Sequence, residues 1–98
     1  MIKVSVIYPN SENQNFDVKY YLENHIPMVK KNLGDSCKKV EVDIGFDEKS
    51  PYIAMAHLIY ESLDAFQQSF GPYEDIIMND IPNYTQIQPI VQISEIKM

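Results

Sequence analysis

The chain has 98 residues and a formal net charge of −6, and its eight basic residues are all lysine. Such a chain lacks the clustered Lys and Arg side chains that bind nucleic-acid phosphates, and it has no apolar run of membrane-span length. We therefore expect it to bind neither nucleic acid nor a membrane. The length fits one domain, residues 1–98, and the lone Cys37, which cannot form an internal disulfide, favours a reducing, cytoplasmic setting.

The N-terminal third predicts a strand followed by a helix. Residues 2–8 alternate with period two and are rich in β-branched side chains, which predicts a strand, and a polar loop follows over residues 9–15. Asp17 is placed to cap the helix. Because Pro27 lies inside the helical pattern, we expect the helix to kink or restart just before it. The apolar arc of this helix comprises Val18, Leu22, His25, Val29 and Leu33.

Two strands come next. Gly34 is placed to end the helix, and residues 40–44 alternate between apolar and charged side chains, which predicts a half-exposed strand. Residues 52–60 are apolar on both faces, as is typical of a strand in the middle of a sheet. One face carries Tyr52, Ala54, Ala56 and Leu58, and the other carries Ile53, Met55, His57 and Ile59.

The last third predicts a second helix and an edge strand. Ser62 is placed to cap the helix, which continues past an interruption at residues 71–72 to turn residues at 80–83. Residues 87–96 predict the last strand, and Pro89 near its start suits an edge position. The order β-α-β-β-α-β predicts a ferredoxin-like α+β fold, an antiparallel four-stranded sheet with two helices on one face.

The face of this sheet that the helices leave open is partly apolar. Ile7 lies there beside Ile53, Met55 and Ile59. An open apolar face favours association, and two sheets packed face to face as a symmetric pair would bury it. We therefore expect a homodimer with a shared, barrel-like core.

Few residues suit cofactor chemistry. The two histidines and one cysteine show no His-x-x-x-His or Cys-x-x-Cys spacing, and no glycine-rich phosphate loop is present, so we expect no metal and no cofactor. The missing arginine and the acidic charge disfavour phosphorylated or strongly anionic substrates, although Lys3 and Lys19 could contact a carboxylate. The expected partner is a small hydrophobic ligand.

His25 is the first catalytic candidate. It lies in the apolar arc of the first helix, with Tyr21 one turn earlier and Asp17 two turns earlier. An apolar setting lowers the pKa of a histidine, so His25 would stay neutral and could act as a general base, with Tyr21 orienting it or donating to an oxyanion. A structural role is equally open, because Pro27 frees a backbone carbonyl that a histidine can bind.

His57 and the tyrosines are weaker candidates. His57 points to the open sheet face, where a structural bond to Ser5 or Gln92 is the favoured interpretation and a ligand contact in the dimer interior is the alternative. Seven tyrosines are many for this length. Aromatic rings with polar tips can line a ligand pocket or fill a core, which makes Tyr20 and Tyr52 candidate substrate-binding residues.

The chain resembles the EthD family along nearly its whole length, apart from a glycine that the family usually has at residues 13–15. The resemblance is carried by Val6–Asn10, Phe16–Asp17, Tyr20–Tyr21, His25-x-Pro27, Leu33–Gly34, Pro51-Tyr52-x-Ala54, Phe66, Phe70–Pro72, Asp80–Thr85 and Pro89-x-x-Gln92-Ile93. It implies a ferredoxin-like domain of the dimeric α/β barrel superfamily. It also brings forward Asp80, Asn83 and Tyr84 as substrate-binding residues beside His25.

The resemblance leaves several functions open. It implies a cofactor-independent oxidoreductase of monooxygenase type, or an isomerase-type enzyme, acting on a small hydrophobic metabolite. The alternative is a non-catalytic accessory protein that holds a hydrophobic metabolite for a partner oxygenase. Haem binding through one histidine is a third option, by analogy with other members of the superfamily.

Overall fold

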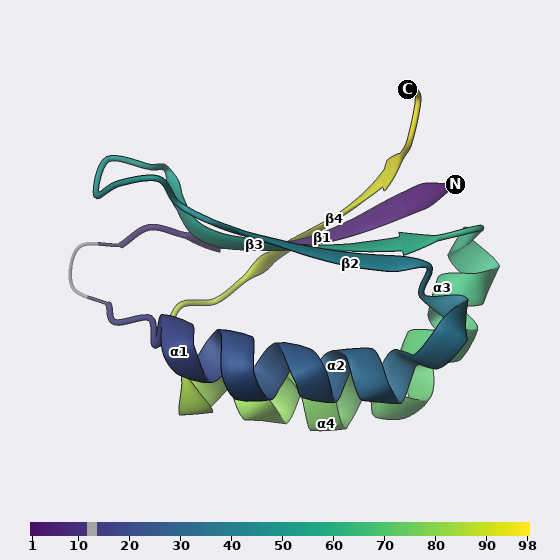
Figure 1. Ribbon diagram of the computed structural model, residues 1–98, viewed down its shortest axis with the longest axis horizontal. Coiled ribbons are helices and arrows are strands. Elements are labelled where there is room, and N and C mark those ends of the chain that lie inside the picture. Colours follow the sequence, from purple (N-terminus) through teal and green to yellow (C-terminus); the bar gives the residue numbers. More distant parts are fainter. Residues whose placement is uncertain (12–13) are drawn as a thin grey trace.

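Four strands form one antiparallel sheet in the order β2-β3-β1-β4 in the computed structural model, which describes residues 1–11 and 14–98. The strands are β1 (Ile2–Pro9), β2 (Lys39–Ile44), β3 (Tyr52–Tyr60) and β4 (Ile90–Glu95). The helices all lie on one face of this sheet (Figure 1). The predicted ferredoxin-like βαββαβ arrangement is confirmed. Two positions of the predicted polar loop, residues 12 and 13, lie outside the described residues.

The last strand is shorter than predicted. It begins at Ile90, whereas the apolar alternation suggested a start at Ile87. The backbone N–H of Ile87 donates to Thr85 Oγ1 at 3.1 Å and its side chain is buried in the core, so Ile87 belongs to the core without joining the strand. Pro89 has no N–H for the strand ladder, and β4 lies at the predicted sheet edge.

The first helical run accommodates Pro27 by means of a wider turn that precedes it. It comprises α1 (Val18–Tyr20), a π-helical turn (Tyr21–His25) and α2 (Ile26–Leu33). The Asp17 carboxylate accepts from the Tyr20 N–H at 3.0 Å, as predicted for a cap. The predicted restart takes the form of the π turn, after which Pro27 lies in the first turn of α2, where a missing N–H is tolerated.

The π turn changes which side chains face the sheet. Leu22, predicted to face inward, is 43% exposed, whereas its neighbour Tyr21 is 1% exposed. The prediction for Leu22 is wrong because the extra residue in a π turn rotates the preceding residues relative to α2. The inward residues of the whole run are Tyr21, His25, Ile26, Val29 and Leu33.

The second helical run brings its C-terminal end next to the first run. It comprises α3 (Leu63–Phe70), a 3₁₀ turn (Gly71–Tyr73) and α4 (Glu74–Asp80), followed by a second 3₁₀ turn (Ile81–Asn83). α2 and α4 lie side by side against the sheet (Figure 1). No helix in the described ranges is long and apolar enough to cross a membrane.

The core between helices and sheet has an aromatic part and an aliphatic part. The aromatic part contains Tyr8, Tyr21 and Tyr84, with Phe16 packed against them. The aliphatic part contains Val4, Val29, Leu33, Leu58, Tyr60 and Ile77. Both parts contribute walls to the cavity described next.

Candidate functional site

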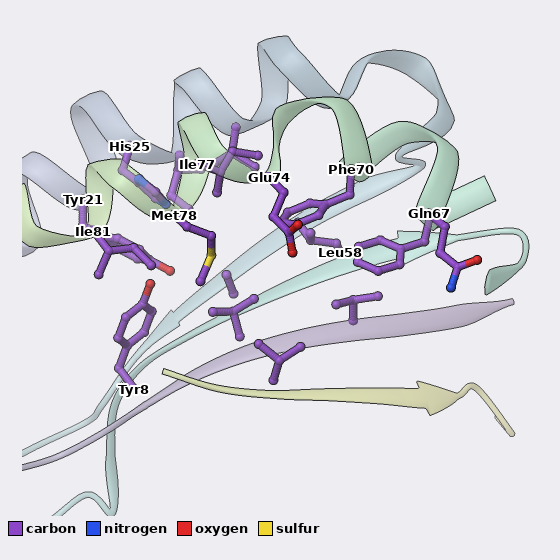
Figure 2. A pocket seen from close by; sticks show the side chains of 18 residues that line it. Tyr8, Tyr21, His25, Leu58, Gln67, Phe70, Glu74, Ile77, Met78 and Ile81 are labelled. Carbon is purple, nitrogen blue, oxygen red and sulfur yellow. The ribbon is translucent and has the colours of Figure 1, made fainter. Parts of the chain in front are cut away.

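A cavity of about 480 Å³ lies between the helices and the sheet. Its floor is formed by apolar side chains of β1, β3 and β4, and its roof by both helical runs (Figure 2). The floor residues are Val4, Val6, Ala56, Leu58 and Val91. Tyr8, Tyr21 and His25 lie together at one end, and Gln67 and Phe70 lie toward the other. A largely apolar cavity with a few polar groups gathered at one end is typical of a site for a small ligand.

His25 is held in place by Asp80, which comes from the end of α4. Nδ1 of His25 lies 2.8 Å from Oδ2 of Asp80, and the histidine is 4% exposed. The other carboxylate oxygen, Oδ1, accepts from the Tyr20 hydroxyl at 2.8 Å and from Asn83 Nδ2 at 2.9 Å. The partner of His25 is thus Asp80, whereas Asp17, two turns earlier on the helix, acts as the cap that was predicted.

The Asp80 interaction defines the protonation state of the imidazole. Burial alone would raise the pKa of Asp80, but hydrogen bonds from Asn83, His25 and Tyr20 hold it below its usual value. The ionised carboxylate can only accept, so Nδ1 of His25 carries the proton. Burial lowers the pKa of His25, although Asp80 opposes this, so the ring is neutral at neutral pH.

The second nitrogen of His25 is available to a ligand. In the neutral ring with a proton on Nδ1, Nε2 carries a lone pair. No side chain in the described part of the chain bonds to Nε2, and His25 lines the cavity. The arrangement gives the cavity a neutral proton acceptor whose other nitrogen is paired with a carboxylate, which is how a general base is built.

Tyr21 supplies a free hydroxyl beside His25. Its ring stacks on the imidazole with centroids 5.7 Å apart and an interplanar angle of 14°. The residue is 1% exposed, and its hydroxyl has no hydrogen-bond partner among the residues described. Burial raises the pKa of Tyr21, so the phenol keeps its proton and can donate it in a hydrogen bond. A buried donor without a partner costs about 1–3 kcal/mol, which a ligand oxygen in the cavity would recover.

The remaining residues of the predicted site lie outside the cavity wall. Tyr20, Asp80 and Asn83 form the hydrogen-bonded group behind His25. Tyr84 is 3% exposed, bonds to the Tyr8 hydroxyl at 2.6 Å and packs its ring 4.7 Å from that of His25. Tyr52 is paired with Pro9 at one end of the sheet. Tyr20, Asp80, Asn83 and Tyr84 therefore support the site, Tyr21 and His25 line it, and Tyr52 does neither.

His57 lies on the opposite face of the sheet. Its Nδ1 lies 2.8 Å from the Ser5 hydroxyl, which is one of the two structural partners predicted for it. Its Nε2 lies 3.2 Å from Asp43 Oδ2. Cys37 is half-buried, and burial raises the pKa of its thiol, which fits a structural cysteine. Neither residue lines the cavity.

Tyr8 and Glu74 are cavity residues that were not among the predicted site residues. Tyr8 alternates onto the helix side of β1, so its inward direction was predictable, but its position at the polar end of the cavity depends on how α1 and α4 pack. Glu74 is the second, and its carboxylate enters the cavity from the first turn of α4. No pattern in the sequence distinguishes Glu74 from the neighbouring acid Asp75.

A family model and several solved structures match the chain. The EthD domain model matches residues 11–88. An EthD-like protein from Ralstonia eutropha JMP134 is 38% identical in sequence and superposes with a TM-score of 0.88, over 99% of this chain and 92% of that one. A search of curated proteins finds no match.

Two more distant structures share the fold. A dimeric protein of unknown function and ferredoxin-like fold from Bacteroides fragilis NCTC 9343 has a TM-score of 0.67 at 12% identity, over 97% of this chain and 95% of that one. A protein from Bordetella bronchiseptica, named provisionally as an antibiotic biosynthesis monooxygenase, has a TM-score of 0.67 at 11% identity, over 99% and 97%. At these identities the likeness concerns the fold alone.

Proposed function

Because the chain belongs to the EthD family and places a buried His–Asp pair beside an apolar cavity, we propose that it is an enzyme acting on a small hydrophobic metabolite. His25 is the general base and Tyr21 is the hydrogen-bond donor to the substrate. The reaction is an isomerisation or a cofactor-independent oxygenation. The observation that carries this proposal is Tyr21, a cavity-lining residue whose ring stacks on His25 and whose hydroxyl has no partner among the described residues.

Proton abstraction is the step that these residues support. Nε2 of His25 takes a proton from an acidic C–H or O–H of the substrate, and the imidazolium formed is stabilised by the Asp80 carboxylate at Nδ1. The electron pair left on the substrate moves onto an oxygen that accepts from the Tyr21 hydroxyl. Return of the proton to a different carbon completes an isomerisation, whereas reaction of the carbanion with dioxygen, the oxidant, begins an oxygenation. Tyr20 and Asn83 act through Asp80.

A test of the base does not require the natural substrate. Phenyl alkyl ketones in deuterium oxide exchange their α-hydrogens slowly, and NMR measures this exchange directly. We expect the protein to accelerate the exchange of ketones that enter the cavity and His25→Ala to reduce the acceleration about 100-fold or more. Tyr21→Phe should reduce it about tenfold to 100-fold, because the enolate oxygen loses its donor.

His57→Ala is the matched control, because it removes the other histidine from the opposite sheet face. Its exchange rate should equal that of the unchanged protein. If His25→Ala retains full exchange activity, His25 is not the base. If ketones bind saturably without accelerated exchange in any variant, the protein is a carrier, which is the accessory role that the apolar cavity also supports.

A second copy of the chain is the partner that we propose for the open sheet face. This face carries the half-buried Ile7, Ile53 and Met55 and the buried Ile59. A structural neighbour is described as dimeric, which supports the same arrangement. Sedimentation equilibrium at micromolar concentration should give twice the chain mass, and Met55→Lys should shift the mass toward that of one chain. A single-chain mass for the unchanged protein would contradict the homodimer.

A further inference from the structure

Glu74 places a negative charge on the wall of an otherwise uncharged cavity, and its side chain is exposed to solvent as well. It lies in the first turn of α4, and its carboxylate points from the helix toward the sheet, between the Tyr21–His25 end and Gln67 (Figure 2). It is the one acidic side chain among the cavity-lining residues that the structure describes, and no ion pair there involves it. A ligand in the cavity therefore meets a carboxylate that no protein cation neutralises.

The cavity wall offers no positive charge to balance it. None of the lining residues in the described ranges is a lysine, and the chain has no arginine. His25 is neutral because burial lowers its pKa, and Tyr21 keeps its proton because burial raises its pKa. A ligand anion would thus lie near an unpaired, solvent-exposed carboxylate, and like charges about 4 Å apart repel by about 1 kcal/mol in water.

We propose that Glu74 makes the cavity favour uncharged or cationic ligands over anions. The ligand places an oxygen at the Tyr21 and His25 end and an uncharged or protonated basic group near Glu74. This inference rests on the proposed function, because it assigns the substrate class of the same cavity. It narrows the hydrophobic metabolite to a neutral ketone, phenol or similar compound, with or without an amine, and disfavours carboxylates and sulfonates.

Two fluorescent probes with one ring system test the selection. N-phenyl-1-naphthylamine is uncharged, and 8-anilino-1-naphthalenesulfonate is the same molecule with a sulfonate. We expect the uncharged probe to bind at least tenfold more tightly than the sulfonate. Glu74→Gln should strengthen sulfonate binding about fivefold, the equivalent of about 1 kcal/mol, and leave binding of the uncharged probe within twofold.

Asp75→Asn is the matched control for overall charge. Asp75 follows Glu74 in the same turn and is exposed as Glu74 is, but it does not line the cavity. It should leave the affinity of both probes unchanged. Equal gains in sulfonate affinity from Glu74→Gln and Asp75→Asn, or no gain from Glu74→Gln, would overturn the inference while leaving the base-catalysis proposal intact.

A further pair of variants locates the probe. Val91 lines the cavity and is 53% exposed, whereas Ile76 is 54% exposed and lies outside the lining. Val91→Trp should weaken binding of the uncharged probe, and Ile76→Trp should not. If the uncharged probe fails to bind, or binds without regard to Val91→Trp, the cavity does not take it and the substrate assignment fails. The exchange measurements with His25→Ala then decide separately whether the base is active.

Discussion

The two histidines are similar in their hydrogen bonds and different in their surroundings. His25 bonds to Asp80 at 2.8 Å beneath the helices, and His57 bonds to Asp43 at 3.2 Å on the open sheet face. The side chains of the first pair are 5% and 18% exposed, and those of the second are 17% and 65% exposed. A His–Asp pair therefore does not identify a site by itself, because solvent screens the second pair far more than the first.

The free nitrogen is the other difference. Both nitrogens of His57 have partners, Ser5 and Asp43, so the ring links three strands of the sheet. His25 uses one nitrogen for Asp80 and lines the cavity, and its other nitrogen has no partner among the described residues. The His25–Asp80 pair therefore has a nitrogen free to exchange a proton with a ligand, whereas both nitrogens of His57 are used in contacts within the sheet.

Removing the aspartate of each pair should separate them most strongly. Asp80→Ala leaves the buried His25 and the Tyr20 hydroxyl without their acceptor, so we expect the free energy of unfolding to fall by about 2–3 kcal/mol. Asp43→Ala breaks an exposed contact and should change it by no more than about 0.5 kcal/mol. Urea denaturation measures both. Equal losses would show that burial does not distinguish the two pairs.

The pH dependence of stability should report His25. Burial holds its pKa in the folded protein below the 6.5 of an exposed histidine. The folded state therefore binds fewer protons than the unfolded state just below pH 6.5, and the free energy of unfolding falls as the pH drops from there toward the folded pKa, by at most about 1.4 kcal/mol per pH unit.

His25→Gln removes this contribution and is the control for the pH effect. Its free energy of unfolding should vary less between pH 7 and pH 5 than that of the unchanged protein. An NMR titration of the His25 ring measures the pKa directly. A midpoint above 6.5 would mean that Asp80 outweighs burial, and stability would then be lost as the pH rises instead.

The smallest effect compares two buried tyrosine hydroxyls. Tyr8→Phe removes the hydrogen bond to Tyr84 and should cost about 1 kcal/mol of unfolding free energy. Tyr21→Phe removes a hydroxyl that has no partner in the described structure, so it should leave stability unchanged or raise it by up to about 1 kcal/mol. Thermal or urea denaturation measures the change in unfolding free energy for both variants. Equal losses would show that Tyr21 has a partner in solution.

Local patterns predicted much of the fold. The span of β3 was predicted to the residue, because its apolar run is bounded by Pro51 and the capping residue Ser62. The caps at Asp17 and Ser62 were also predicted, since a cap is a contact between residues three positions apart. The bond between His57 and Ser5 could be anticipated because alternation places both on one face of adjacent strands.

Predictions failed where a contact depends on distant segments. The π turn was not readable from the sequence, so Leu22 was assigned to the inward face that Tyr21 occupies. The last strand was predicted to begin too early in the sequence, because the apolar side chain of Ile87 packs in the core and is not part of the strand. Apolar alternation indicates that side chains are buried. It does not indicate whether the buried residues belong to a strand or to a segment beside the end of a helix.

The sequence alone determined the order of the elements, the caps at Asp17 and Ser62 and most of the apolar faces, and it favoured His25 over His57 as a candidate base. These features follow from the spacing of residues that lie close together in the sequence. Only the tertiary structure decided that Asp80, 55 positions away, pairs with His25, that Tyr21 lacks a partner and that Glu74 enters the cavity. Each of these depends on how α2 and α4 pack on the sheet, and packing geometry sums many long-range contacts that no local pattern encodes.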